Sequence, residues 1–514
     1  MMPNKPTQVG NAFLTMKELP TFPKQLEKER ELSASLIIQT ATSKKCMSKL
    51  KISFWVGLTG IILVLSMLLR LKNLALVPRP GESMDEYSNA WVGLSLIRLG
   101  IPVGRSGLIG YGGNDYRYVN VDHFFSNTAG GNPLGINKPW FDHPPLLGLI
   151  TGGYALVAGA QVFEETTARI IRRPMIIIGV AAVVATGWLA YLLYGPGAGA
   201  IAMAIAGTSP LMVVSSRMGQ GENLLIVFWL LSLICLFYYK KREKRRWLWL
   251  TAMMAGLAML SKVSGAAAVF TGGIILFNQD KKSWVVRLSK VGLFVTVSLS
   301  LLALFFVYGL AIDGRVFVNV WLSNSNRPYD IGYSPIFNLI TTTKITISKL
   351  MTDGWPLIGW FGIVALWFKN KRHDQLFIIL PLIIYLVIFL LMGGSSYGWY
   401  RTPFMPFLII AAAWVSVNGL EKGLKTIPIV LLLIPLGINL GKINELIPLT
   451  IIKPYLRLGW PLVILVSCVL EFLPFGSQLA RPTKMFYCLL LALALISNVI
   501  IISLLTPEAW LSIN

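Results

Sequence analysis

The chain has 514 residues, of which 55% are hydrophobic and 13% are charged, and its formal net charge is +23. A soluble protein of this composition would expose much of its apolar surface, so the composition excludes an ordinary soluble domain. Most of the surplus positive charge lies in short clusters between apolar segments, as expected where Lys and Arg stay on the cytoplasmic side of a membrane. The charge therefore indicates contact with membrane lipids, and we expect no nucleic-acid partner.

Fourteen apolar segments recur along the chain, each close to the length that crosses a bilayer as a helix. We predict an all-α integral membrane protein with about thirteen transmembrane helices and a large outer-face loop that carries interfacial helices. The apolar segments are residues 52–69, 145–162, 174–194, 198–214, 224–239, 247–261, 263–277, 291–312, 355–368, 376–392, 404–417, 427–440, 458–470 and 485–505.

The distribution of basic residues predicts the orientation of these helices. The basic tail 1–51 and the densest basic cluster, residues 240–246, should both be cytoplasmic. Counting segments back from that cluster leaves 145–162 beginning and ending outside. This segment is short, is rich in glycine and opens with two prolines, so we predict a re-entrant or interfacial helix on the outer face, which leaves thirteen spans.

The same count divides the chain into parts. Residues 1–51 form a cytoplasmic tail, 52–420 a catalytic membrane module, and 421–514 a set of C-terminal transmembrane helices. Two long loops of the module, 70–173 and 313–354, fall on the outer face, and loops of this length favour a functional role. We therefore expect a protein of the plasma membrane with a cytoplasmic N-terminus and an active site on the non-cytoplasmic face.

Adjacent carboxylates follow the first span. Asp85 and Glu86 lie in Gly-Glu-Ser-Met-Asp-Glu-Tyr, near the membrane surface. A carboxylate within hydrogen-bond reach of an acceptor hydroxyl could take its proton, with the neighbouring carboxylate as a positioning group. An exposed acidic loop is the alternative.

Two Asp-His pairs occur in the same loop. Asp142 and His143 precede two prolines that predict an extended turn before the outer-face helix. His143 could contact a substrate or a metal, or only complete the turn. Asp122 and His123 form the second pair, but no spacing identifies a metal site. We assign no metal ligands, and a divalent cation is a minor alternative.

Further ionisable residues lie in the predicted outer turns. Arg217 and Glu222 lie in one turn, Lys262 in a second, and Tyr400 and Arg401 in a third. Charged groups at the end of a span that faces a cavity are candidates for function. The alternatives are an arginine that reaches the membrane surface, a carboxylate at a helix start, and an aromatic belt. Together these turns place carboxylates and cations at one face, which suits a phosphate-bearing lipid and a hydroxyl acceptor.

The order of these motifs resembles the C-type membrane glycosyltransferases (GT-C) that use polyprenyl-phosphate sugars, which include protein O-mannosyltransferases and aminoarabinose transferases. The resemblance covers roughly residues 50 to 420. It differs from the family's pattern where Arg169-Ile-Ile-Arg172 replaces an Arg-Leu-Pro run, and where Glu222 replaces an aspartate. The matching motifs are Asp85-Glu86, His143-Pro-Pro-Leu, Ala168-Arg169, Ser216-Arg217, the stretch from Gly256 to Lys262, and Arg401-Thr-Pro-Phe-Met-Pro.

The resemblance implies an inverting transfer of a hexose or pentose from a polyprenyl-phosphate carrier to a hydroxyl of a protein, lipid or glycan. Asp85 would be the general base, and Glu86 would orient the substrate or hold the loop. Cations must neutralise the phosphate leaving group. Arg217, Lys262 and Arg401 are the candidates, and Arg169 and Arg172 rank below them.

Other readings remain open at this point. The first alternative is a transporter or flippase of lipid-linked glycans, although no internal repeat is apparent and few charges lie inside the spans. A glycan polymerase or ligase is closer in kind, and a catalytically silent scaffold with the same fold is a third reading.

Overall fold

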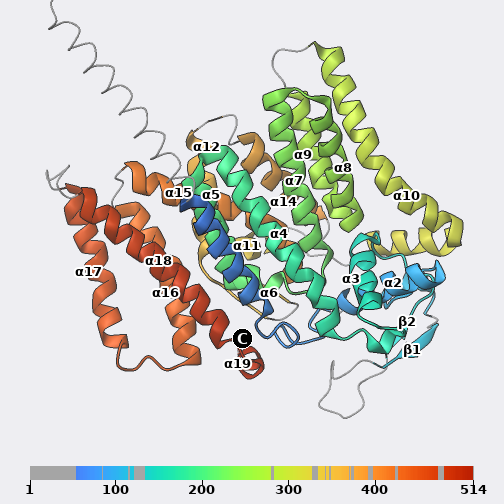
Figure 1. Ribbon diagram of the computed structural model, residues 1–514, viewed down its shortest axis with the longest axis horizontal. Coiled ribbons are helices and arrows are strands. Elements are labelled where there is room, and N and C mark those ends of the chain that lie inside the picture. Colours follow the sequence, from blue (N-terminus) through green and yellow to red (C-terminus); the bar gives the residue numbers. More distant parts are fainter. Residues whose placement is uncertain are drawn as a thin grey trace, which may run out of the picture. The chain divides into compact units, whose positions relative to one another are not determined.

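The computed structural model describes residues 54–83, 85–113, 116–120, 134–278, 283–326, 334–341, 343–346, 349–369, 371, 375–391, 397–422, 426–472 and 480–512. The chain divides into the units Met1–Gly57 and Leu58–Asn514, and the helices and strands discussed below belong to the larger unit, except for the first turn of the helix Phe54–Leu71 (Figure 1). The predicted tail 1–51 and the pair Asp122 and His123 lie outside the described residues.

Helices account for all fourteen apolar segments, which confirms the predicted all-α membrane fold. After the helix Phe54–Leu71, the described elements are α2 (Asp85–Leu99), η1 (Ile109–Tyr111), β1 (Arg117–Val119), β2 (Leu134–Ile136), α3 (Leu146–Val157), η2 (Phe163–Glu165), α4 (Ala168–Tyr194), α5 (Pro196–Thr208), α6 (Pro210–Ser215), α7 (Gly221–Arg242), α8 (Arg245–Ser261), η3 (Val263–Gly265), α9 (Ala266–Phe277), α10 (Trp284–Ser325), α11 (Ser334–Thr341), α12 (Trp355–Lys369), η4 (Gln375–Ile379), α14 (Leu380–Leu391), η5 (Gly398–Phe404), α15 (Met405–Lys422), α16 (Thr426–Leu446), α17 (Lys453–Phe472), α18 (Ala480–Leu504) and α19 (Pro507–Ser512).

Length and apolar composition allow seven of the described helices to cross a membrane by themselves. Several other predicted spans are shorter in the structure, such as α5, which ends at Thr208 because Ser209 and Pro210 start a new helix, α6. Proline fits the first turn of a helix, and the Ser209 hydroxyl accepts a hydrogen bond from Met212 N. The count of thirteen spans stays a prediction.

The hairpin of α7 and α8 explains how distant polar residues meet. The apolar sequence of α7 ends in Lys240, Lys241 and Arg242, which suit the negative end of the helix dipole. The chain then turns and α8 runs back, so the start of α7 lies beside the end of α8. Gly221 permits this contact, because a Cβ there would lie 2.7 Å from Ser261 O.

The first predicted outer loop is a folded layer with its own apolar core. Trp91 of α2 packs against Phe163 and donates from Nε1 to Thr166 Oγ1 at 2.6 Å. An antiparallel pair of short strands, which the sequence did not predict, joins Tyr118 to Gly135. The described part of the loop therefore has a core of its own, which positions the residues that it carries.

Glycines bring the two helices of this layer into close contact. A Cβ on Gly93 of α2 would lie 1.7 Å from Gly148 O of α3, and one on Gly152 would lie 2.2 Å from Leu94 N. The glycine-rich segment therefore packs directly on α2, as Figure 1 shows on the right of the view. Its twelve residues fit the predicted short outer-face helix, and its depth in the membrane stays a prediction.

The second predicted outer loop, 313–354, contains more helix than expected. α10 continues past a kink at Asp313, whose backbone is non-helical, and reaches Ser325. The Asp313 carboxylate accepts a hydrogen bond from Val316 N at 2.9 Å, so it caps the second half of the helix. Phe317 then packs against Phe141 of the first loop, which joins the two loops.

The C-terminal helices are joined to the others by buried amides and hydroxyls. Asn439 of α16 donates to Asn498 Oδ1 of α18 at 2.7 Å, and Asn498 donates to Thr208 Oγ1 of α5 at 3.2 Å. Hydrogen bonds of this kind hold helices together where water is absent. These asparagines carry no charge and follow no motif, and the sequence did not single them out.

Candidate active site

Asp85 is the first residue of α2 and is half-buried. Residues on both sides of it are bonded to the turn between α6 and α7. Gln220 donates to the Ser83 hydroxyl, and Asn89 Nδ2 donates to Gly219 O at 2.9 Å. The position of Asp85 is therefore fixed against this turn.

Glu86 lies in a buried ion pair that no motif indicated. Both of its carboxylate oxygens accept from Arg172 of α4, at 2.6 Å and 2.9 Å, and both side chains are 0% exposed. The remaining nitrogen of Arg172 donates to Leu74 O and Pro78 O. Of the two roles considered for Glu86, this geometry favours holding the loop over contacting substrate. Arg172, ranked low for phosphate binding, is the residue that pairs with it.

Arg217 points into the protein rather than into a cavity. Its guanidinium donates to Leu69 O at 2.6 Å and to Val77 O at 3.1 Å. Burial, together with the charges of Arg172 and Arg70, lowers the pKa of Arg217 to about 9. Leu69 O is among the last carbonyls of the first helix, whose negative dipole end favours a cation. The geometry therefore gives Arg217 a structural contact and does not bring it to the cavity described below.

Glu222 and Lys262 form a second buried pair, at the meeting point of α7 and α8. The Lys262 ammonium donates to Glu222 Oε1 and lies 4.2 Å from the centre of the Tyr400 ring. Asp85 is close enough to Glu222 for their charges to interact. Lys262 and Glu222 are therefore in direct contact, and Asp85 lies within the range of a charge interaction with Glu222.

Asp142 is held by two hydroxyl groups. Ser106 Oγ and Tyr111 Oη each donate to its carboxylate at 2.6 Å, and Tyr111 Oη accepts from Phe141 N at 2.7 Å. Burial, followed by the charge of Asp142, raises the pKa of Tyr111, so this phenol remains a donor. His143 follows with its ring edge-on to Trp140, at 5.8 Å between centroids. The Asp-His pair is a fixed feature of the loop surface.

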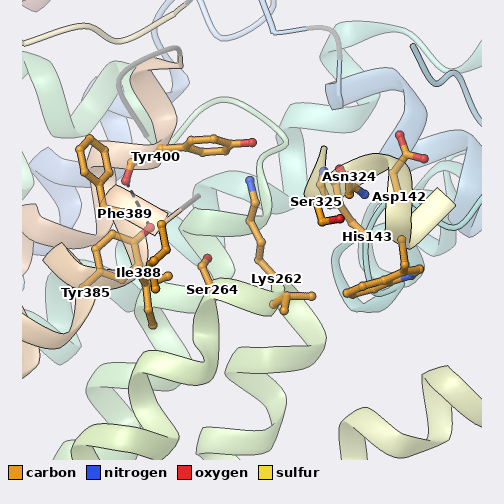
Figure 2. Close-up of a pocket in the computed structure, with 13 residues that line it drawn as sticks. Asp142, His143, Lys262, Ser264, Asn324, Ser325, Tyr385, Ile388, Phe389 and Tyr400 are labelled. Atoms are coloured by element: carbon orange, nitrogen blue, oxygen red, sulfur yellow. Dashed lines mark hydrogen bonds between the residues drawn. The ribbon is translucent and has the colours of Figure 1, made fainter. Parts of the chain in front are cut away.

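A cavity of about 320 Å³ brings many of these residues together. Figure 2 shows Lys262 between two walls of different character. One wall is aromatic and apolar and comes from α14 and η5, and the other is polar and comes from the first outer loop and the end of α10. The first wall contains Tyr385, Ile388, Phe389 and Tyr400, and the second contains Asp142, His143, Asn324 and Ser325.

Six of the ten predicted site residues do not line this cavity. Asp85 is the half-buried first residue of α2, Arg401 is buried in η5 beside Tyr400, and Arg169 is exposed at the start of α4. The other three, Glu86, Arg217 and Glu222, are buried in the contacts described above. The residue type suited each prediction, but the direction of the side chain depends on packing that the sequence motifs do not contain.

Sequence reasoning missed the part of the polar wall that α10 supplies. Asn324 and Ser325 lie eleven and twelve residues after the kink at Asp313 and were assigned to a loop. The Asp313 cap followed by Val316 and Phe317 was the available signal for a helix restart. Ser264 and Tyr385 also line the cavity, but each lies in an apolar segment and carries no charge.

A metal ligand set is absent from the described part of the chain, where no three His, Cys, Asp or Glu side chains gather. The second Asp-His pair lies outside that part, so the minor alternative of a divalent cation is untested.

The C-terminal helix α19 is anchored beside the segment that leads to Asp85. Trp510 is buried, and its indole N–H donates to both carboxylate oxygens of Glu82, at 3.0 Å and 2.9 Å. Asn73 Nδ2 donates to Leu505 O at 2.7 Å, and Lys349 Nζ donates to Leu511 O at 3.1 Å. The approach to α2 is therefore fixed from the far end of the chain.

Comparison with known proteins supports the predicted resemblance. Residues 142–308 match the family described as dolichyl-phosphate-mannose-protein mannosyltransferase. A Bacillus subtilis (strain 168) protein named "Putative mannosyltransferase YycA" is 28% identical over 188 residues, which are 37% of this chain and 25% of that protein. These matches support a glycosyltransferase. Because they cover only parts of both proteins, the donor and acceptor do not follow from them.

Solved structures give the fold. ArnT from Cupriavidus metallidurans in the apo state has a TM-score of 0.54 at 13% sequence identity. The similarity covers 87% of this chain and 76% of the ArnT chain. The same protein bound to undecaprenyl phosphate has a TM-score of 0.52 at 14% sequence identity, and the similarity covers 90% of this chain and 77% of the ArnT chain. The resemblance predicted from the motifs is thus confirmed, and the chain is an integral membrane protein with the fold of the GT-C membrane glycosyltransferases.

Proposed function

We propose that this protein transfers a sugar, with inversion, from a polyprenyl-phosphate carrier to an acceptor hydroxyl. The observation that carries the proposal is the cavity in which one buried cation, Lys262, lies between an apolar-aromatic wall and a polar wall. A polyprenyl-phosphate sugar has the same three parts in the same order, namely an apolar chain, a phosphate and a polar sugar. The match between the two orders supports this substrate class.

The donor would bind with its chain end along Ile388 and Phe389 and its sugar against Asn324 and Ser325. Lys262 would then face the phosphate. An ammonium has three N–H donors, of which Glu222 accepts one, so the others can point to phosphate oxygens. ArnT, which shares the fold, has been solved with undecaprenyl phosphate, and this supports a lipid phosphate as ligand.

In the proposed reaction, the acceptor oxygen forms a bond to the anomeric carbon of the sugar. The bond between that carbon and the phosphate oxygen breaks, and its electron pair leaves with the phosphate. Asp85 takes the proton of the acceptor hydroxyl, and because Asp85 does not line the cavity, this requires the acceptor to enter between Asp85 and the bound sugar. Lys262 stabilises the developing phosphate charge, which is a large effect in a site that excludes water. Attack from the face opposite the leaving group inverts the anomeric centre.

The charge distribution supports an active site on the non-cytoplasmic face. α7 carries Glu222 at its first turn and the basic residues 240–242 at its last turn. Lys and Arg are retained on the cytoplasmic side, so the opposite end of α7 would face outward. The N-terminal tail would then also be cytoplasmic, in the plasma membrane.

The test is an assay of the purified protein with labelled polyprenyl-phosphate sugars and mixed protein, lipid and glycan acceptors. Asp85→Asn should lower the transfer rate by a factor of about 10² to 10⁴, the usual contribution of a general base. Glu164→Gln is the matched control, because Glu164 is an exposed carboxylate of the same loop. Movement of the labelled lipid across vesicles without transfer would instead support a flippase, and growth of glycan chains would support a polymerase or ligase.

A further inference from the structure

A second cavity lies in the C-terminal hairpin of α16 and α17, and it shares no lining residue with the candidate active site. Its volume is about 230 Å³. Each helix contributes residues at spacings of three, four and seven, so each presents one continuous face to the cavity. The lining residues are Gly437, Leu440, Gly441 and Asn444 of α16, Leu449 of the turn, and Lys453, Leu456, Arg457 and Trp460 of α17.

The face of α16 is hollow because two of its residues lack side chains. A Cβ on Gly437 would lie 3.4 Å from Trp460 Nε1, and one on Gly441 would have no atom within 4 Å. Two helices that only packed together would fill this space with apolar side chains. Here the space between them stays open as a groove.

The face of α17 brings two positive charges to that groove. Lys453 and Arg457 are one helical turn apart, and their side chains make no hydrogen bond or ion pair with any described residue. The nearby carboxylate Glu445 is paired with Lys442 at 2.8 Å. Like charges four residues apart destabilise a helix slightly, and an anion between them would remove this cost.

We infer that the groove binds the head group of an anionic phospholipid. Lys453 and Arg457 would contact the phosphate, and Trp460 would lie at the boundary between head group and acyl chains, where tryptophan is favoured. The outer surface of α17 is apolar, since Leu458, Leu462 and Leu465 are all more than half exposed. Such a surface faces acyl chains in a membrane, so the anion that reaches this groove carries acyl chains. Basic pockets between membrane helices recognise anionic lipids in this way.

Native mass spectrometry of the full-length protein tests the inference. The protein in neutral detergent is titrated with phosphatidylglycerol or with phosphatidylcholine of the same acyl chains. We expect one phosphatidylglycerol to bind preferentially, and the double substitution Lys453→Ala and Arg457→Ala to weaken it about tenfold or more, since each cation contributes to attraction of an anionic lipid. Equal binding of both lipids, or unchanged binding by the double variant, overturns the inference.

A pair of glycine substitutions distinguishes the contribution of the open groove to lipid binding from the contribution of the two positive charges. Gly441→Leu fills the groove and keeps both cations, whereas Gly459→Leu makes the same change on α17 outside the lining, and neither position has an atom within 4 Å. Binding should be lost in the first variant and kept in the second. Equal effects of the two substitutions on lipid binding would contradict binding of the head group in the groove.

Two competitors identify the source of the anion. Displacement of phosphatidylglycerol by millimolar inorganic phosphate would show a soluble-anion site, and tighter binding of a polyprenyl phosphate would show a second carrier site. Either result overturns the assignment to a phospholipid. Phosphatidylglycerol that resists both competitors supports it. None of these readings depends on transferase activity.

Discussion

Among the described residues, two buried acid–base pairs lie in the segments that carry the predicted site residues, and their surroundings differ. In the pair Glu86–Arg172, four of the five guanidinium N–H groups donate to the carboxylate or to backbone carbonyls, and both side chains are fully buried, away from the cavity. In the pair Glu222–Lys262, the ammonium donates to one oxygen and borders a cavity. A buried charge pair therefore indicates a binding site only when some of its hydrogen-bonding capacity faces open space.

The first pair should matter for stability. Arg172→Met leaves the carboxylate of Glu86 buried without its partner, and we expect a loss of about 3–5 kcal/mol in the free energy of unfolding. Arg173→Met, the exposed neighbour on α4, is the control and should have little effect. Thermal unfolding in detergent gives the comparison. Similar stability of the two variants would show that the buried pair is not a structural requirement.

The second pair should matter for activity. Lys262→Met should lower kcat/KM by the equivalent of about 2–4 kcal/mol, the range for loss of one donor to a developing negative charge. Lys241→Met, in the basic turn at the other end of α7, is the control. If Lys262→Met lost as much stability as Arg172→Met and no more activity, the distinction between the pairs would be wrong.

Loss of one hydroxyl donor to Asp142 should lower activity by a smaller amount. Tyr111→Phe removes one of the hydroxyl donors to this carboxylate and should cost about 1.5–3 kcal/mol, the range for a hydrogen bond to a charged group. The loss should appear in kcat/KM if Asp142 faces the donor sugar. Tyr116→Phe is the control, because Tyr116 is half exposed. A loss confined to thermal stability would limit Asp142 to a structural role.

The buried carboxylate Asp353 has no cation partner among the described residues and should give the smallest effect. Its oxygens accept from the Ser209 hydroxyl and from Trp355 N at 3.3 Å, and burial raises its pKa. The folded state therefore holds the proton more tightly than the unfolded state. Its contribution to stability is complete below the ordinary aspartate pKa and is lost as the pH rises through the raised value.

Asp353→Asn should remove this pH dependence, so its unfolding free energy should fall less than that of the wild type between acidic and neutral pH. Thermal unfolding at a series of pH values measures the difference. Parallel curves for the two proteins would show that Asp353 does not titrate in that window.

The sequence predicted the helices, because these depend on the length of the apolar segments. It also predicted Asp142, His143, Lys262 and Tyr400 as substrate-binding candidates, and all four line the cavity. It did not predict that Arg217 points inward, because the carbonyls that it contacts come from residues about 140 positions away. Asn324 was missed for a different reason, since the helix that presents it restarts after a polar kink.

The contact between Glu82 and Trp510 joins residues 428 positions apart. During synthesis, the segment that leads to Asp85 is made early but acquires this partner only after nearly all other helices have been inserted. The geometry at Asp85 is therefore completed late, and a protein stalled before α19 would contain every residue of the cavity without this support. A tag or fusion placed directly after α19 would disturb the contact between Glu82 and Trp510. It would therefore lower the activity although it lies far from the cavity.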